Sequence, residues 1–352
     1  MTPCRGEWRI ERTALPLERS NESLPCMACI PAAREESSDC NGKREKPMTH
    51  SISSRSYNAL RLLGTVTVFF IFLGSLGCGG ASSPGAARPT PTPTSNGSVP
   101  GFGHVVLVVE ENSSYSDVIG SSEMPYLNSL AAQYGLATRY FANTHPSIGN
   151  YFMLTTGQIV TNDDSFTGTV DVDNIVRELL ASGKTWKSYA ESRNDPILYA
   201  KWHDPLSYFS DVVNSSTQMQ NLTLFSQFSS DLSNNVLPNF SFVVPNLLND
   251  GHSGPLQLAD SFLQDNIAPL ISNATFQKDG LLIIVFDEAA TSDSTNGGGH
   301  VAAVIISAKA KQGFQSTTLY QHQSILRLIL EGLGVSTLPG ASSAAPGMGE
   351  FF

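Results

Sequence analysis

Two neighbouring carboxylates, Asp287 and Glu288, directly follow a run of six apolar residues, 281–286. Such a run is typical of a strand that is buried on both faces, in the middle of a sheet covered by helices. In open α/β sheets, ligands bind at the carboxyl ends of these strands. A glycine-rich loop then returns the chain to His300 and to a further apolar stretch, residues 301–306. Carboxylate oxygens and an imidazole near one strand edge indicate a site for a divalent cation.

Polar side chains also follow two other predicted strands. Glu111 and Asn112 come after the apolar residues 104–109, and His252 follows the strand predicted at 239–244 by a few residues. Because the carboxyl ends of parallel strands meet at one edge of a sheet, we expect these side chains to lie near the acidic pair. Each has a simpler interpretation when taken singly: acids that begin a solvated loop, an asparagine in a turn, or a surface histidine. The functional interpretation depends on their shared position.

Ser147 is the candidate nucleophile. It follows His145 and Pro146, and proline is favoured at the first position of a helix, so Ser147 is predicted at a helix amino terminus. Backbone N–H groups and the helix dipole favour an anion such as phosphate at this position. The alternative is that the serine is an ordinary helix cap.

The elements that must position these residues alternate along the chain. We predict helices at residues 124–134, 173–182, 256–271 and 322–331, and strands at 104–109, 136–141, 185–189, 239–244, 281–286 and 301–306. The stretch 191–227, which contains His203, is rich in loop-forming residues. Alternating strands and helices predict an α/β fold, a mostly parallel sheet with helices on both faces.

The first hundred residues are organised differently. Residues 1–47 carry charges of both signs without an apolar period, so we expect a disordered or non-native upstream extension. Met48 then opens a basic stretch ahead of an apolar core at 62–76, and residues 48–78 are predicted to be a secretory signal peptide. Its core is shorter than the ~20 residues of a transmembrane helix.

Cys78, at the end of this signal, resembles the lipidated cysteine of a bacterial lipoprotein; cleavage and release is the alternative. Residues 79–101 are rich in Pro, Thr and Ser and are predicted to be an extended linker. All 5 cysteines lie within the first 78 residues, so a domain at 102–352 would fold without disulfides. We therefore expect an exported protein: a periplasmic or cell-surface lipoprotein tethered to a membrane through Cys78, or a secreted one.

The charge of the predicted domain restricts its partners. From residue 102 onward the sequence has 23 Asp and Glu residues against 10 Lys and Arg. Such an acidic domain is a poor candidate for binding nucleic acid. An anionic substrate would need local positive charge, which again favours a bound metal.

Four separated segments carry a family resemblance. They are VVEENSSY (108–115), HPSIGNY (145–151), FDE (286–288) with GHV (299–301), and YQHQSILR (320–327). Together they resemble the signature segments of the bacterial phosphoesterase family. That family joins acid phosphatases to phospholipase C-type enzymes and belongs to the alkaline-phosphatase superfamily. The resemblance implies a three-layer α/β/α fold with one divalent metal ion.

The resemblance also implies roles for individual residues. The metal-binding positions are Glu111, Asn112, Asp287 and Glu288. Ser147 matches the nucleophile, and His252 or His203 would protonate the leaving alcohol. Polar positions around the phosphoryl group are matched by His145, Asn150 and His300. Many relatives have Leu-Pro where this chain has Ile148 and Gly149, a difference that affects the geometry beside the nucleophile.

The expected activity is therefore hydrolysis of small phosphomonoesters by a metal-dependent acid phosphatase, through a phosphoserine intermediate. One alternative is a phospholipase C-like phosphodiesterase. A second, from a different class, is a non-catalytic surface lipoprotein that uses the fold to bind a ligand.

Overall fold

The computed structural model describes residues 97–352. The predicted extension, the signal peptide with Cys78 and most of the linker lie outside these described residues. Within residues 97–352, no helix combines the length and the apolar character that crossing a membrane would require.

The central sheet is built around three parallel strands. They are β1 (His104–Glu110), β7 (Gly280–Phe286) and β6 (Phe240–Val244), with β1 between the other two. Every residue of β7 and β6 is buried, as expected for strands covered on both faces. Because the three strands are parallel neighbours, their carboxyl ends lie side by side at one edge of the sheet.

Five further strands complete this eight-stranded sheet, whose order is β10-β2-β9-β7-β1-β6-β4-β5. Their bounds are Gln315–Ser316 (β10), Gly135–Ala137 (β2), Ala303–Ile306 (β9), Trp186–Ala190 (β4) and Leu222–Leu224 (β5). β9 runs antiparallel to β7 and to β2, and the other pairings are parallel. The prediction of a mostly parallel sheet is confirmed.

Two predicted strands are each divided between two sheets. The stretch 136–141 forms β2 and, after a turn, β3 (Tyr140–Phe141). The stretch 301–306 likewise forms β8 (His300–Val301) and β9. In a small second sheet, β3 lies between β8 and β11 (Tyr320–Gln321) and pairs with both. Apolar runs predict the strands but not the sheet that each one joins.

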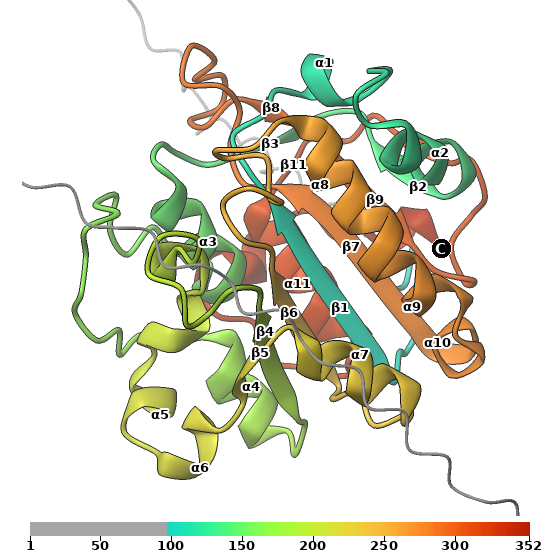
Figure 1. Ribbon diagram of the computed structural model, residues 1–352. Coiled ribbons are helices and arrows are strands. Elements are labelled where there is room, and N and C mark those ends of the chain that lie inside the picture. Colours follow the sequence, from blue (N-terminus) through green and yellow to red (C-terminus); the bar gives the residue numbers. More distant parts are fainter. Residues whose placement is uncertain (1–96) are drawn as a thin grey trace, which may run out of the picture. The chain divides into compact units, whose positions relative to one another are not determined.

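Helices cover both faces of the main sheet, as predicted. In Figure 1, α8 and α9 lie in front of β7 and β1, whereas α11 lies behind them. The helix α11 packs against α3 and α4, and α2 packs against α8. The bounds are Pro125–Gln133 (α2), Ser147–Thr156 (α3), Ile175–Ala181 (α4), Leu256–Phe262 (α8), Ala268–Ser272 (α9) and His322–Gly332 (α11).

The helix predicted at 256–271 is interrupted. Between α8 and α9 the chain makes a π-helical turn, Leu263–Ile267. Pro269, near the start of α9, has no N–H to donate to the carbonyl four residues earlier, so a regular helix cannot run through it. The apolar period did not reveal this break.

The loop-rich region predicted at 191–227 contains short elements. His203 ends the 3₁₀ helix η1 (Lys201–His203), which is followed by η2 (Pro205–Tyr208). The same loop-rich region contains the edge strand β5, which pairs with β4 alone. The remaining helices are α1 (Tyr115–Val118), α5 (Ser210–Val213), α6 (Ser216–Met219), α7 (Ser226–Ser233) and α10 (Ala274–Asp279).

Candidate active site

Glu111 is the residue around which the site is arranged. It follows β1 directly, is fully buried, and is fixed by its N–H, which donates to Asp250 O at 2.7 Å. Ser147 Oγ donates to Glu111 Oε2 at 3.1 Å, and the Tyr151 hydroxyl donates to Oε1. Burial, followed by the charges of Asp287 and Asp250, raises the pKa of Glu111 well above its usual range. The glutamate therefore lies beside the candidate nucleophile and can accept a proton from it.

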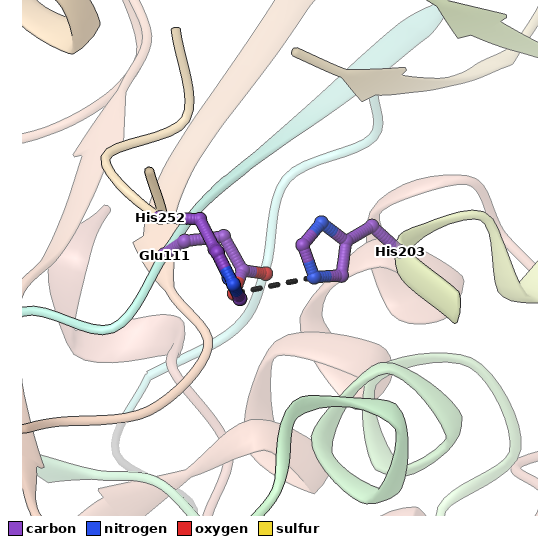
Figure 2. Close-up of side chains that lie close together, drawn as sticks. All are labelled: Glu111, His203 and His252. Atoms are coloured by element: carbon purple, nitrogen blue, oxygen red, sulfur yellow. Dashed lines mark hydrogen bonds and ion pairs between the residues drawn. The ribbon is translucent and has the colours of Figure 1, made fainter. Parts of the chain in front are cut away.

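Two histidines lie against Glu111 on one side. His203 Nε2 is 3.4 Å from Glu111 Oε2, and His203 Nδ1 is 3.3 Å from Asp250 Oδ2. His252 Nδ1 is 3.5 Å from the same Glu111 oxygen, and Figure 2 shows both imidazoles beside this carboxylate. We call His203, His252 and Asp250 the histidine flank.

The two histidines differ in environment. Burial lowers the pKa of His203, whose side chain is 1% exposed, and its ring stacks on that of Tyr151. The His252 side chain is 33% exposed. Asn112 Nδ2 donates to His252 Nδ1 at 2.7 Å, which leaves a proton on Nε2 in the neutral imidazole. His252 is therefore the histidine that can reach a group entering from solvent.

Asp287 and Glu288 lie on the other side of Glu111 and, with His145, form what we call the acidic flank. Asp287 Oδ1 accepts the N–H of Asn112 at 3.1 Å. Asn112 makes this contact from a left-handed conformation with φ of 51°, which asparagine tolerates better than most residues. Burial and the charge of Glu288 raise the pKa of Asp287 well above its usual range. Burial and the charge of Asp164 raise the pKa of Glu288 to about 8.

His145 shares a proton with Glu288. Its Nε2 lies 3.0 Å from the carbonyl oxygen of Asp293, which can only accept, so Nε2 carries a hydrogen. Its Nδ1 lies 3.0 Å from Glu288 Oε2. A contact this short between a carboxylate and an imidazole nitrogen requires a proton between them. The pair is therefore held together by one proton, and His145 orients Glu288.

The amide of Asn150 organises the chain ahead of the nucleophile. Its Oδ1 accepts the N–H groups of Asn143 and Thr144, and its Nδ2 donates to Thr144 O at 2.8 Å and to Glu288 Oε2 at 3.4 Å. These bonds occupy most of the capacity of the amide. Its contacts support a role in shaping the site more than the expected contact with substrate.

His300 is engaged away from these groups. Its Nε2 is 3.0 Å from Thr138 O, and its ring stacks between those of Tyr115 and Phe141, with centroid separations of 4.3 and 4.8 Å. The structure thus brings together eight of the ten predicted residues around Glu111 and the acidic pair, and a ninth, Asn150, at their border. The contacts of His300 do not support the expected approach to the phosphoryl group.

The helix amino terminus also differs from expectation. The N–H of Ile148, which directly follows the nucleophile, donates to Asp164 Oδ1 at 3.1 Å. A backbone donor that we expected to face phosphate is thus bound to a side chain of the same protein.

Sequence reasoning missed a buried histidine behind the acidic flank. His322 Nε2 lies 2.6 Å from the backbone oxygen of Asp287, and the Tyr140 hydroxyl lies 3.0 Å from its Nδ1. Burial lowers the pKa of His322 to about 4, so the ring stays neutral and donates to Asp287 O. The segment that contains it was recognised, but nothing in the local pattern linked it to Asp287. Asp250 and Tyr151 were missed for the same reason.

The site has the properties of a cation site. Five carboxylates at this sheet edge are buried: Glu110, Glu111, Asp250, Asp287 and Glu288. Within residues 97–352, none of them forms an ion pair with Lys or Arg. Asp287 Oδ2 has no hydrogen-bond partner among these residues. Glu111, His203 and His252 also offer ligand atoms within 4.8 Å of one another. A divalent cation fits this donor set.

Solved structures support the fold. A protein of the alkaline phosphatase superfamily from Vibrio parahaemolyticus aligns with a TM-score of 0.50 at 14% identity, over 72% of each chain. The lipoteichoic acid synthase LtaP from Listeria monocytogenes also gives 0.50 at 12% identity, over 74% of this chain and 78% of that one. At these identities the likeness concerns the fold alone, and it confirms the predicted architecture.

Curated relatives are closer in sequence. A probable acid phosphatase from Kluyveromyces lactis is 31% identical over 242 residues, which cover 64% of this chain and 56% of that protein. An acid phosphatase from Aspergillus fumigatus is 27% identical over 70% of this chain and 58% of its own length. The chain thus spans little more than half of these two fungal proteins. A phosphatidylinositol-3-phosphatase from Mycobacterium tuberculosis is 29% identical over 83% of this chain and 94% of its own length.

The enzyme class predicted from the sequence, a hydrolase of phosphoric esters, agrees with the names of these relatives. The family model for the Phosphoesterase family matches residues 121–336, more than half of the sequence, and the chain therefore belongs to the Phosphoesterase family.

Proposed function

We propose that the protein is a metal-dependent acid phosphatase that hydrolyses small phosphomonoesters through a phosphoserine at Ser147. The observation that carries the proposal is the position of the Ser147 hydroxyl, which is buried at the start of α3 and bonded to Glu111. The fungal relatives are named acid phosphatases and the mycobacterial one a phosphatidylinositol-3-phosphatase, which supports phosphatase activity here.

One divalent cation would be held at the sheet edge. Glu111 belongs to both candidate ligand sets: with Asn112 and the acidic pair, as predicted, or with His203 and His252. We favour the first set because it contains the larger number of buried carboxylate oxygens. A bound cation would offset the buried charge and stabilise negative charge on the phosphoryl oxygens.

The side chains can then divide the chemistry between them. Ser147 Oγ gives its proton to Glu111 Oε2 and forms a bond to phosphorus, while the bond from phosphorus to the leaving oxygen breaks. His252, which is half-exposed, must act as an imidazolium: it donates the proton on Nε2 to that oxygen and becomes neutral, so the product leaves as an alcohol. Water then gives a proton to the neutral His252 and attacks phosphorus. The bond from phosphorus to Ser147 Oγ breaks, Glu111 returns its proton to the serine, and phosphate leaves. His203, buried between Glu111 and Asp250, holds Glu111 in place.

Hydrolysis of p-nitrophenyl phosphate, measured before and after EDTA treatment, tests the proposal. We expect activity to be lost with EDTA and to return when a divalent cation is added back. Activity that persists in metal-free protein would contradict the metal requirement. Absence of hydrolysis by metal-loaded protein would favour the ligand-binding alternative.

We also propose that the mature protein is exported and begins at or near Cys78, tethered by a lipid on that residue. The basic and apolar pattern of residues 48–78 supports this. Mass spectrometry of the amino terminus from the membrane fraction tests it, and a mature chain that begins at Met1 would contradict it.

A further inference from the structure

A loop that the sequence did not single out lies against the nucleophile. Residues 161–164 pack on the first turn of α3, where Asp164 Oδ1 accepts the N–H of Ile148 at 3.1 Å. Ile148 is the residue after Ser147. A carboxylate is thus fixed one residue from the oxygen expected to attack phosphorus.

Gly149 makes this approach possible. A Cβ atom at this position would lie 2.1 Å from Asn162 Oδ1 and 3.2 Å from the carbonyl oxygen of Thr161, both in the loop. Real Cβ contacts are not as short as 2.1 Å, so a larger residue would push the Asn162 side chain aside and crowd the loop backbone at Thr161. Gly149 therefore allows the loop that carries Asp164 to lie against the first turn of α3.

Asp164 brings a negative charge close to the nucleophile, because its carboxylate is bonded to the first turn of α3 at the residue after Ser147. None of the ion pairs within residues 97–352 includes Asp164, so no cationic side chain offsets this charge there. Its neighbour Asp163 is different: it is exposed and bonded to Ser165 in its own loop.

We propose that Asp164 is a specificity-determining residue that favours singly charged phosphoryl groups over doubly charged ones. The inference rests on the proposed function, since it concerns which phosphate esters that site accepts. A phosphomonoester carries close to two negative charges above its second pKa of about 6, whereas a diester carries one. A fixed negative charge beside Ser147 opposes the binding of the first more strongly than that of the second.

Asp164→Asn separates this role from helix capping. Asparagine keeps Oδ1 as an acceptor for the Ile148 N–H and removes the charge. At pH 8 we expect kcat/KM for p-nitrophenyl phosphate to rise about tenfold, and that for bis(p-nitrophenyl) phosphate to rise about threefold. If Asp164 were only a cap, neither value would rise. Asp163→Asn is the matched control and should change both values less than twofold.

The outcomes are distinguishable. Metal-loaded wild-type protein that hydrolyses neither ester contradicts the proposed function. Active wild-type protein whose Asp164→Asn variant shows an unchanged or lower monoester kcat/KM, or an equal gain on both esters, overturns the role of Asp164. If wild-type protein hydrolyses the monoester alone, kcat/KM for p-nitrophenyl phosphate decides: a rise in Asp164→Asn supports the role of Asp164, and no rise overturns it. Should the Asn variant fail to fold, Asp164→Ser, uncharged and still able to accept a hydrogen bond, allows the same comparison.

Discussion

The two flanks of Glu111 are built from similar residue types in opposite proportions. On the acidic flank two buried carboxylates meet one imidazole, and the pKa of each carboxyl group is raised. On the histidine flank two imidazoles meet one carboxylate, that of Asp250, and the buried His203 has a lowered pKa. The first arrangement is short of positive charge and the second is suited to moving protons. In the proposed mechanism, the acidic flank would hold the cation and the histidine flank would move the proton, on two sides of one glutamate.

Ser147→Ala removes the candidate nucleophile, which is bonded to the glutamate between the two flanks, and should have the largest effect. We expect kcat to fall at least about 10³-fold, because the covalent route is lost, while metal binding is retained. Ser147 makes no capping bond in α3, so the free energy of unfolding should change by less than the ~1 kcal/mol typical of a lost cap. Near-normal kcat with a lowered melting temperature would show that the serine is structural. Ser147→Thr should retain part of the activity.

Asp287→Asn tests which flank holds the cation. Loss of one charged ligand should weaken divalent metal binding, measured by calorimetry, by roughly 100-fold or more. His203→Gln should weaken it much less. If the histidine variant lost as much affinity as the aspartate variant, the ion would belong to Glu111, His203 and His252 instead.

His252→Gln tests proton transfer on the histidine flank. For an alkyl phosphate, whose leaving alcohol needs a proton, we expect kcat to fall about 10²-fold. The fall should be smaller for p-nitrophenyl phosphate, because p-nitrophenolate leaves without protonation. An equal loss on both substrates would mean that His252 positions Glu111 or substrate and does not act as the acid.

The flanks should also respond oppositely to pH in metal-free protein. The pKa of Glu288 is raised to about 8, so its contribution to stability is complete below about 4.5 and is lost as pH rises through 8. The pKa of His203 is lowered, so its contribution is present above about 6.5 and is lost as pH falls. The melting temperature should therefore be highest between about pH 4.5 and about pH 6.5. Glu288→Gln should flatten the alkaline side by a few degrees, and an unchanged alkaline side would contradict this assignment.

The strand ends of this site were predictable because their signal is local. A continuous apolar run followed by acids predicts a buried strand that delivers carboxylates, and both β1 and β7 fit this pattern. Ser147 was placed correctly at the start of α3 because proline, with its fixed φ, is favoured where a helix begins, and Pro146 directly precedes this helix. The partners that reach the site from elsewhere were not predictable in this way. Asp164 and His322 look like ordinary polar residues until the chain is folded.

The contacts of His300 differ from those that its position in the sequence suggested. Its position after a glycine-rich loop near the acidic pair suggested a site residue, but the short strand β8 joins the small sheet and turns the ring between two aromatic side chains. The length of a loop does not determine which of the two sheets the next strand joins. The helix predicted at 256–271 is present, but its π-helical turn was not foreseen, because a period of apolar residues can continue through a proline.

The composition of β1 has a consequence for how the site forms. Residues 105–109 are Val, Val, Leu, Val and Val, and all are buried on one face of the sheet or the other. If β1 shifted by one residue relative to β7, each side chain of β1 would point to the opposite face of the sheet. Residues 105–109 would still pack against apolar groups. The same shift would exchange Glu110 for Glu111 at the sheet edge. The interior of the strand therefore discriminates weakly between an active and an inactive alignment.

Contacts at the two ends of β1 distinguish the correct alignment of the strand from one shifted by a residue, which its apolar interior does not do. His104 Nδ1 contacts Pro238 O at 3.0 Å where the strand begins, and Glu111 N–H donates to Asp250 O where it has ended. Either contact would be broken by a slip of one residue. Pro238 and Asp250, which lie in loops, thus select the alignment in which Glu111 faces the nucleophile. Substitutions that break these contacts can abolish activity in a chain that still folds.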